Sequence, residues 1–590
     1  MIPLWTCREN HVHPEPDFYD NPLDDEPPED DDDDAYEIEE PEDDLVQSNG
    51  GAFAARTSRN DGTRIEDPDR LGDRELDRQK DWTVCVDNFD IDQSYWQDQR
   101  RLDDEPPTLP PIEPYGMLND EQCKLYDCIV DHLEADLRGE DPPQLRVNVD
   151  GVAGTGKTRT ILQASAKVDQ LVRDAGIPNP VVRCAPTGVA AYGLMGSTYH
   201  SLLKLPVSRD FAPLTPGQLS TLQASLKHMR YLIIDEKSMI GVKVLGWINH
   251  RLREIFPHKN MEPFGGVNVL ICGDFWQLQP VCAKPLFTND PKITNPDTLV
   301  GQAAYRSLDK TIRLTQVMRQ QGEDPIAIQF RETLAQLREG NVSHENCRFL
   351  GRRVANELPP SEVARFTDAL RLFPTKVQVS EYNHNRLRDL NEPVKKIKAK
   401  HLGSGASSVD YDNAEGLEAE FDVCIGARVI LSHNLWVEKG LVNGSMGTVR
   451  DISWSAGDDP SKDLPLAVIV QFDGYNGPTL GDTNGVPIFC RTATFVHNKH
   501  NCSRTQIPLR LAYAITIHKS QGMTLDRVVL DLDGARKMVA GAAYVAISRV
   551  KTWQGLLFST YFDDEKLQLE PTPVTRQRID DYTFRDRQCI

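Results

Sequence analysis

The sequence contains no apolar run long enough to cross a membrane. No stretch approaches the ~18 residues that a bilayer-spanning helix needs, and the acidic start has neither the apolar core of a signal peptide nor the arginine-rich character of a transit peptide. The twelve cysteines include no C-x-x-C pair and no His/Cys cluster at metal spacing. We therefore expect an intracellular protein with reduced cysteines and no membrane partner, in the nucleus, with the cytosol and the mitochondrion as alternatives.

Basic residues are also scarce relative to acidic ones. The chain has 66 lysines and arginines against 89 acidic residues, a formal net charge of −23. Residues 1–50 contain 19 acidic side chains and one basic one, so they carry −18 and the remaining 540 residues only −5. Because the body is nearly neutral and can hold a basic groove on one face, the low pI does not exclude a nucleic-acid partner.

The first 115 residues read as an acidic, largely disordered tail and linker. EDDDDD (29–34) repels itself and offers nothing to bury, and DDEPPTLPPIEP (103–114) reads as an extended linker. The segment WTVCVDNFDI (82–91) is a candidate for a short docking strand. The tail either solubilises the protein or recruits a protein partner.

A glycine-rich turn follows the alternating run QLRVNVD and precedes a helical pattern. Its glycines let consecutive backbone N–H groups point at a phosphate, while Lys157 adds a charge beside the terminal phosphates and Thr158 offers a hydroxyl to Mg²⁺. The segment thus predicts a P-loop for ATP. The residues of this cradle are Gly151, Val152, Ala153, Gly154, Thr155, Gly156, Lys157 and Thr158.

A buried strand that ends in two carboxylates supports this prediction. YLIIDEKSM (231–239) places Asp235 at the carboxyl edge of a parallel sheet, where such sheets bind ligands. Asp235 can hold the metal with Thr158, and Glu236 can orient or deprotonate the attacking water. An Asp-Glu pair can also simply cap a helix, but beside a P-loop it predicts an ATPase with Mg²⁺.

Three further residues are typical of phosphate sensing. Gln277 follows the strand VNVLIC, and Arg319 and Arg549 each follow an apolar stretch in which an unpaired guanidinium would be costly. A phosphate bound in a cleft between two lobes would satisfy them, although ordinary salt bridges would do so too. No N-K-x-D-type segment marks a GTPase, and a small-molecule kinase would not need the long remainder of the chain.

The ordered motifs resemble those of superfamily 1 DNA helicases of the Pif (petite integration frequency) type, a group that includes the helicase portion of Helitron transposons. The resemblance covers residues 118 to about 560. The motifs are LNDEQ (118–122), GVAGTGKT, APTGVAAYGLMGSTYHS (185–201), IIDEKSM, PFGGVNVLICGDFWQLQPV, LTQVMRQ, GARVILSHN…GLVNGSMGTV (426–449), LAYAITIHKSQGMTL (511–525) and AYVAISRVKT.

The resemblance implies an α/β fold of two RecA-like parallel-sheet domains with a small SH3-like all-β insertion in the second. It implies that Gln122 reads adenine, that Gln277 senses the γ-phosphate and that Arg319 and Arg549 reach it across the cleft. Lys237 departs from the family, which usually has a small or apolar residue there. The expected domains are 1–115 (tail and linker), 116–365 (first, with a strand-separating wedge near 202–228), 366–565 (second, with the insertion near 440–508) and 566–590 (C-terminal tail).

Two motifs supply candidate DNA contacts because they gather short polar groups suited to phosphates. Thr187 could instead cap a helix, and His518 more often serves as scaffold than as base. The basic run PVKKIKAK (393–400) is interpreted as a solvated loop. The candidates are Thr187, Gly188, Ser197, Thr198 and His200 in the first motif and Thr516, His518, Lys519, Ser520 and Gln521 in the second.

These patterns predict an ATP-dependent DNA helicase that moves 5′-to-3′ on single-stranded DNA, the polarity being implied by the resemblance. Single-stranded and forked DNA are the expected partners, a monomer the expected state, and DNA repair, recombination or telomere maintenance the expected setting. The alternatives are a translocase that does not unwind, a transposon-derived remnant, and a binding module in which ATP only switches conformation.

Overall fold

The computed structural model describes most of the chain from residue 70 onward. The described residues are 70–83, 91–92, 94–102, 108–206, 210–480, 484–498, 500–533, 538–569 and 572–590. The acidic run 29–34 and most of the predicted docking strand at 82–91 lie outside them. None of the described helices combines the length and the apolar character that a membrane crossing requires.

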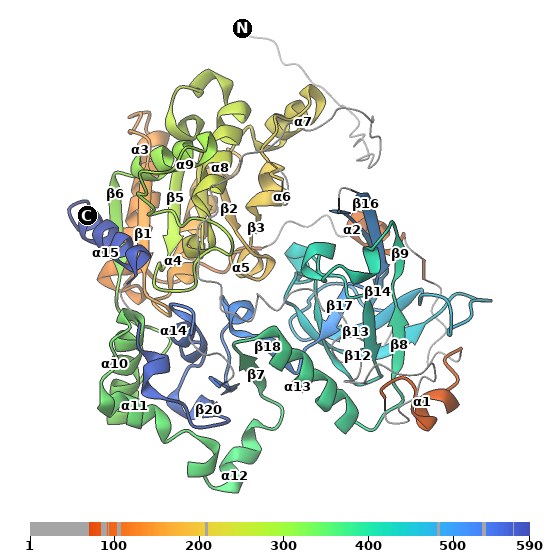
Figure 1. Ribbon diagram of the computed structural model, residues 1–590. Helices are drawn as coiled ribbons and strands as arrows, with labels where there is room; N and C mark the ends of the chain where they lie inside the picture. Colours follow the sequence, from red (N-terminus) through yellow and green to blue (C-terminus); the bar gives the residue numbers. More distant parts are fainter. Residues whose placement is uncertain are drawn as a thin grey trace. The chain divides into compact units, whose positions relative to one another are not determined.

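A six-stranded parallel sheet forms the first part of the described fold (Figure 1). Its strand order is β3-β2-β4-β5-β1-β6. The strands are β1 (Arg146–Gly151), β2 (Val181–Ala185), β3 (Ser197–Thr198), β4 (Tyr231–Ile234), β5 (Asn268–Gly273) and β6 (Lys310–Leu314). The longer helices of this part are α3 (Asp120–Leu137), α4 (Lys157–Asp174), α7 (Pro216–Leu226), α8 (Val242–Ile255) and α9 (Pro296–Arg306).

Both faces of this sheet are buried, as the apolar run of β4 requires. Tyr231 and Ile233 pack in the cluster that contains the apolar residues of α3 and α4, whereas Leu232 and Ile234 pack in the cluster that contains those of α7 and α8. Successive strand residues point to opposite faces, so a strand covered on both sides must be apolar throughout. Polar chemistry is thereby left to the strand ends.

A four-stranded parallel sheet with the order β18-β7-β19-β20 forms a second α/β part. The α/β fold with parallel sheets is confirmed. The strands are β7 (Leu370–Phe373), β18 (Ala514–Thr516), β19 (Val528–Leu530) and β20 (Leu556–Phe558). The helices of this part are α10 (Pro325–Glu339), α11 (His344–Gly351), α12 (Pro360–Val363), α13 (Lys376–Asp389) and α14 (Ala542–Ile547).

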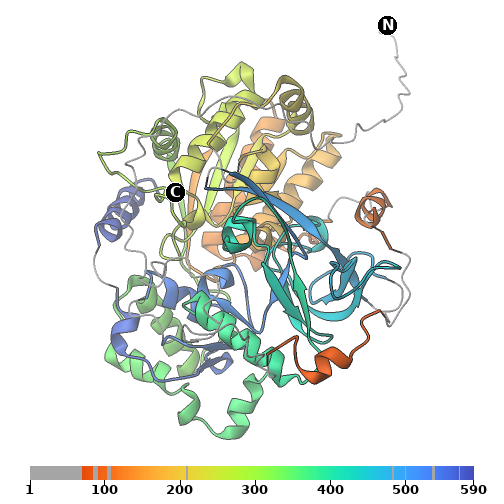
Figure 2. The same ribbon diagram turned by 45° about the vertical axis from the view of Figure 1, so that its right-hand side comes forward.

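Antiparallel strands fill the chain between α13 and β18, and they are drawn in teal to blue in Figure 1 and Figure 2. They form sheets of the order β14-β13-β12-β11-β17, β15-β16-β9 and β10-β8. The strands are β8 (Lys395–Lys398), β9 (Lys400–Leu402), β10 (Glu420–Val423), β11 (Arg428–Leu431), β12 (Met446–Ser453), β13 (Ala467–Phe472), β14 (Val486–Phe489), β15 (Arg491–His497), β16 (His500–Gln506) and β17 (Leu509–Leu511).

The interpretation of PVKKIKAK (393–400) as a solvated loop is wrong. Residues 395–398 form β8, which pairs with β10, and Ile397 is buried in the core of the antiparallel sheets. The lysines of this run hid the strand because their charge dominates the local pattern. Antiparallel pairing therefore begins well before the predicted boundary near residue 440.

Part of the segment predicted to be loose is folded. Helix α1 (Glu75–Gln79) and helix α2 (Tyr95–Leu102) lie within it, and Leu71 is buried among the antiparallel strands. Asp77 accepts the N–H of Val394 at 2.7 Å, and the Trp82 and Trp454 ring centroids lie 6.3 Å apart. The acidic composition concealed these few apolar anchors, which find their partners only in the tertiary structure.

The segment predicted as a C-terminal tail contains helix α15 (Pro573–Asp586), which packs against the first sheet. The buried Arg585 guanidinium donates to the carbonyl oxygens of Tyr305 (3.0 Å) and Leu308 (2.9 Å). After α15, a bridge pairs Cys589 with Thr311 of β6. The chain thus returns from the second parallel sheet to the edge of the first.

We predict that Arg585→Ala lowers the free energy of unfolding by about 2 to 3 kcal/mol, because two carbonyl groups in a buried environment lose their donor. Denaturant unfolding followed by circular dichroism measures the change. Arg587→Ala, at an exposed position of the same segment, is the control and should stay within about 0.5 kcal/mol of the unmodified protein. Equal stability of the two variants would contradict the docking of α15.

Candidate functional site

The P-loop joins the end of β1 to the start of α4. Gly154 and Gly156 have φ values of +85° and +80°, which side chains rarely adopt. A Cβ at Gly154 would lie 2.8 Å from the Cβ of Arg319, and one at Gly156 would lie 2.7 Å from Nε2 of Gln122. Glycine is therefore required at both positions by backbone conformation and by space.

Polar side chains donate hydrogen bonds to the carbonyl oxygens of this turn. Lys157 Nζ donates to the carbonyl oxygens of Gly151 (2.5 Å) and Val152 (3.2 Å). Gln122, which caps the start of α3, donates to the carbonyl oxygen of Thr155 at 2.9 Å. The predicted adenine-reading residue therefore lies at the cradle.

The two carboxylates of the predicted catalytic pair follow β4 directly. Thr158 Oγ1 donates to Asp235 Oδ2 at 3.2 Å, so the two predicted metal ligands are adjacent. Glu236 adopts the left-handed conformation with φ 55° and ψ 48°. Burial and then the charge of Asp235 raise the pKa of Glu236, against the opposing effects of Lys157, Gln521 and Arg549. A carboxyl with a raised pKa is suited to accept a proton.

The end of β5 supplies Asp274 and Gln277. Asp274 is fully enclosed; burial opposes its ionisation, but the guanidinium of Arg338 on α10, 3.1 Å away, lowers its pKa overall. Gln277 is only 4% exposed, and its Oε1 has no hydrogen-bond partner among the described residues. A buried amide oxygen without a protein partner is unusual, and this one can accept a hydrogen bond from a bound ligand.

Arg319 and Arg549 meet at the same place from different segments. The Arg319 backbone N–H donates to Gly154 O at 2.9 Å, and its guanidinium donates to Ser548 O at 2.9 Å. Arg549 is 2% exposed and donates to Val545 O (2.7 Å) and to Ser548 Oγ (2.8 Å). Burial and the charge of Arg319 lower the pKa of Arg549 to about 10.

The structure does not support the alternative that Arg319 and Arg549 form ordinary salt bridges. Within the described ranges, Arg319 and Arg549 bond to carbonyl and hydroxyl oxygens and form no ion pair with a carboxylate. Two like charges held close together in a mostly buried place are unfavourable, and the carboxylates of Glu236 and Asp274 offset them without forming an ion pair with either guanidinium among the described residues. The cluster is therefore suited to binding an anion.

The sequence analysis missed Tyr544, to which it assigned no role at the site. Its hydroxyl accepts the N–H of Ala153 at 3.0 Å and donates to Asp274 Oδ2 at 3.2 Å. Tyr544 thus connects α14 to both the P-loop and the end of β5. The available signal was general: a buried tyrosine needs a partner for its hydroxyl.

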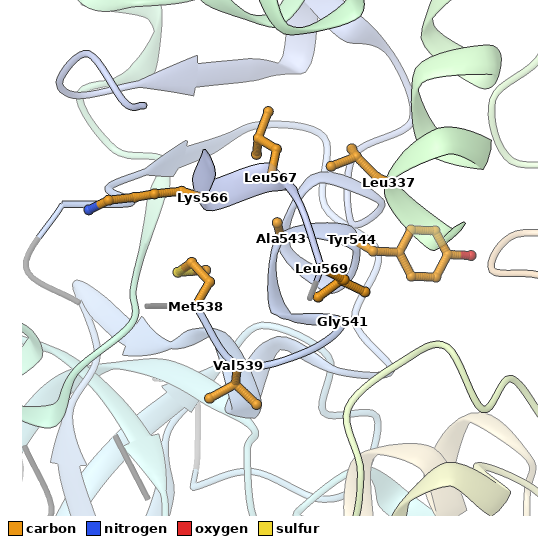
Figure 3. A pocket seen from close by; sticks show the side chains of 9 residues that line it. All are labelled: Leu337, Met538, Val539, Gly541, Ala543, Tyr544, Lys566, Leu567 and Leu569. Carbon is orange, nitrogen blue, oxygen red and sulfur yellow. The ribbon is translucent and has the colours of Figure 1, made fainter. Parts of the chain in front are cut away.

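A small pocket lies behind Tyr544 (Figure 3). Its lining is mostly apolar and comes from α10, α14 and the segments beside them. It contributes no polar chemistry to the cradle. The lining residues are Leu337, Met538, Val539, Gly541, Ala543, Tyr544, Lys566, Leu567 and Leu569.

The first predicted DNA motif forms capped turns. Thr187 Oγ1 caps α5 (Gly188–Gly193) and Thr198 Oγ1 caps α6 (Tyr199–Leu203), each accepting a backbone N–H at 3.3 Å. A Cβ at Gly188 would lie 2.3 Å from Asn434 Oδ1, so this turn abuts the antiparallel strands. Ser197 lies in β3 and His200 in α6, where burial lowers the pKa of His200.

The second predicted DNA motif divides into an exposed and a buried half. His518 and Lys519 are exposed, whereas Ser520 is buried and bonds to Ile517 O at 2.7 Å. Gln521 is 6% exposed and donates to Glu236 Oε2 at 3.2 Å. Thr516 is the N-cap residue of the short 3-10 helix Ile517–Ser520, which holds the middle of this motif. One loop therefore reaches the catalytic pair with one end and the surface with the other.

Sequence comparison relates the chain to known DNA helicases. Residues 117–348 match the family model described as PIF1-like helicase. ATP-dependent DNA helicase PIF1 of Homo sapiens is 29% identical over 457 residues, 76% of this chain and 61% of the relative. The protein of the same name from Xenopus laevis is 30% identical over 439 residues, 71% of this chain and 60% of the relative. The chain thus spans about three-fifths of the length of these relatives.

Solved structures agree with this relationship. The crystal structure of Pif1 helicase from Candida albicans matches with a TM-score of 0.59 and 25% identity, over 80% of this chain and 99% of that chain. Bacteroides Pif1 bound to ssDNA shares the fold, with a TM-score of 0.56 and 22% identity over 80% of this chain and 97% of that one. These matches confirm the resemblance predicted from the motifs: the chain is similar to the PIF1-like helicases over most of its length.

Proposed function

We propose that this protein is an ATP-dependent DNA helicase, which hydrolyses ATP at the P-loop, moves 5′-to-3′ on single-stranded DNA and unwinds duplex. One observation carries the proposal. Two guanidinium groups that form no ion pair with a carboxylate in the described part of the chain, the half-buried Arg319 and the buried Arg549, lie at the glycine turn together with the carboxylate pair. Arg549 follows α14 in the second parallel part, so a triphosphate held there would connect both parallel sheets.

The residues present fit ATP with Mg²⁺. Thr158 and Asp235 offer adjacent oxygen ligands, which Mg²⁺ prefers. The described part of the chain holds no cluster of three His, Cys, Asp or Glu residues that could bind a metal by itself, as expected for an ion that takes its other ligands from phosphates and water. Oε1 of Gln277, which has no partner among the described residues, can accept a hydrogen bond from water. If the side-chain amide is turned over, its NH₂ group can donate one instead.

Each side chain then has a role in hydrolysis. Bound Mg²⁺ would polarise the terminal phosphoryl group. Lys157, now hydrogen-bonded to carbonyl oxygens of the turn, neutralises phosphate charge. Glu236 orients the attacking water and accepts its proton, for which its raised pKa is suited. Arg319 and Arg549 stabilise the charge that develops on the transferred group.

Gln521 supplies the mechanical link between hydrolysis and DNA. It contacts Glu236, while its neighbours His518 and Lys519 remain exposed for a strand. Any displacement of this loop by DNA therefore changes the surroundings of Glu236. Phosphate contacts of this kind give binding that tolerates sequence and weakens with salt.

The finer architecture also belongs to the proposal. We assign the predicted ranges 116–365 and 366–565 to two RecA-like domains, with the boundary moved to the start of α10 because α10 and α11 pack in the core of the second sheet. We assign the antiparallel strands of the second domain to an SH3-like insertion. The support is one parallel sheet in each range, with the antiparallel strands enclosed in the second. The proposed strand-separating wedge, residues 202–228, includes α7. Its sequence does not identify one residue that would separate the two DNA strands.

The proposed partners and setting follow from the family names. We propose single-stranded and forked DNA as substrates, a monomer as the working state, and a role in DNA repair, recombination or telomere maintenance. The nucleus is the proposed location, with the mitochondrion as alternative, and the acidic tail is proposed to recruit a protein. The similarity to ATP-dependent DNA helicases supports helicase activity.

Strand displacement on tailed duplexes tests this function. We expect unwinding of 5′-tailed but not 3′-tailed duplex with ATP, and none with Lys157→Ala, whose ATP turnover should fall at least 100-fold because the phosphate charge is no longer neutralised. Binding of Lys157→Ala to single-stranded DNA should stay within about twofold.

The exposed Lys292→Ala, outside every proposed DNA or ATP contact, is the matched control and should unwind normally. Turnover without strand separation would favour the non-unwinding translocase. Turnover that persists in Lys157→Ala would refute the assigned cradle.

A pH dependence of DNA binding follows from Lys519. The surrounding protein desolvates its ammonium and Arg510 adds positive charge, which lower its pKa to about 8. Lys519 is therefore charged below pH 8 and loses its charge as the pH rises, whereas bound phosphate favours the charged form. We predict that affinity for single-stranded DNA falls roughly fivefold between pH 7.5 and 9.5.

Lys519→Arg keeps its charge throughout this range and should show a flatter profile in fluorescence anisotropy. Parallel profiles of the two proteins would remove Lys519 from the DNA site.

A further inference from the structure

Lys237 occupies an unexpected position next to the catalytic pair. It follows Glu236 directly and is fully buried, with 0% of its surface exposed. Its Nζ forms an ion pair with Asp150 and donates to Asn148 Oδ1 at 2.7 Å. Nothing in the ATPase mechanism above uses this ammonium.

The partners of Lys237 belong to the strand that leads into the P-loop. Asn148 and Asp150 lie in β1, and Gly151 follows Asp150. In the sheet, β5 separates β1 from β4. No strand pairing therefore joins the β4 end that carries Glu236 to the β1 end that carries the phosphate cradle. Lys237 makes this connection with its side chain.

The end of β5 is shaped to let this side chain pass. Gly273 has a φ of +150°, and a Cβ there would lie 2.6 Å from Lys237 N and 2.9 Å from Lys237 Cγ. The next but one residue, Phe275, places its ring 4.4 Å from Lys237 Nζ. The lysine thus crosses over β5 in a space that only glycine leaves open.

Stability alone does not account for a charge in this place. Replacement of a buried ion pair by apolar residues of similar size is often neutral or stabilising. Meanwhile Glu236 holds a left-handed conformation that non-glycine residues rarely adopt and that the surroundings must enforce. The backbone N–H of Glu236 donates to Asp235 Oδ1. The next residue, Lys237, is anchored through its side-chain ammonium to Asn148 and Asp150 of β1.

We propose that Lys237 is a positioning residue for ATP hydrolysis: by tying the loop of Glu236 to Asn148 and Asp150 across β5, it fixes the catalytic carboxylate relative to the phosphate cradle. The inference rests on the proposed ATPase function. It assigns to Lys237 the task of fixing the distance between two motifs whose strands, β1 and β4, do not pair with each other directly.

The test combines removal of the anchor with a count of intact sites. Lys237→Met alone leaves Asp150 without a counter-charge, so the primary variant is Lys237→Met with Asp150→Asn. With single-stranded DNA present, we expect its kcat for ATP to fall at least tenfold, while KM and the stoichiometry of binding of a non-hydrolysable ATP analogue, measured by calorimetry, stay within twofold of the unmodified protein.

Lys243→Met is the matched control, since it breaks an ion pair with Asp210 (2.8 Å) and a contact with the Trp247 ring, both away from the ATP site, and it should keep its full kcat. A wild-type kcat in the double variant would overturn the proposal. So would a loss of binding stoichiometry with normal turnover per remaining site, because that result describes a scaffold residue.

Asp150→Asn alone keeps the lysine and its bond to Asn148, and it serves if the double variant does not fold. It is expected to lower kcat at least threefold at unchanged stoichiometry, and an unchanged kcat would overturn the proposal. Absence of turnover in the unmodified protein would instead refute the proposed function, so the two failures are distinguishable.

Discussion

The pairing of two guanidinium groups at the glycine turn is the constraint on which the site depends. The charge of the half-buried Arg319 acts on the buried Arg549, and neither forms an ion pair with a carboxylate among the described residues, although Glu236 lies close enough to act on both. An anion that joined the two guanidinium groups would relieve the cost of holding them together. A triphosphate would therefore draw together groups from two parallel sheets, and its cleavage would release part of that attraction.

The strand ends give this charge its setting. β1, β4 and β5 deliver the phosphate turn, the carboxylate pair and Asp274 to one edge of the first sheet. Tyr544 and Gln521 reach this edge from the other parallel part, through the N–H of Ala153 and the carboxylate of Glu236. Contacts of this kind make the nucleotide site sensitive to movement of the second part and of its exposed loop.

Much of this site could be predicted from the sequence because its chemistry follows local patterns. The glycines and Lys157 lie in one short segment, and the carboxylate pair directly follows YLII in another. The structure brings the two segments together as expected. Tyr544 and Lys237 could not be assigned, because their partners lie on strands or helices distant in sequence. The same reason hid α15, whose arginines bond to carbonyl oxygens that no sequence pattern reveals. The acidic composition of the first 115 residues also hid the folded part of that segment, where Leu71 and Trp82 pack against the antiparallel strands.

The most direct measurement compares the affinities of ATP and ADP in single-arginine variants. If the two guanidinium groups serve the terminal phosphate, Arg549→Gln and Arg319→Gln should each weaken binding of a non-hydrolysable ATP analogue at least tenfold, or about 1.4 kcal/mol, and leave ADP affinity unchanged. Equal losses for both nucleotides, or no loss for either, would contradict the account.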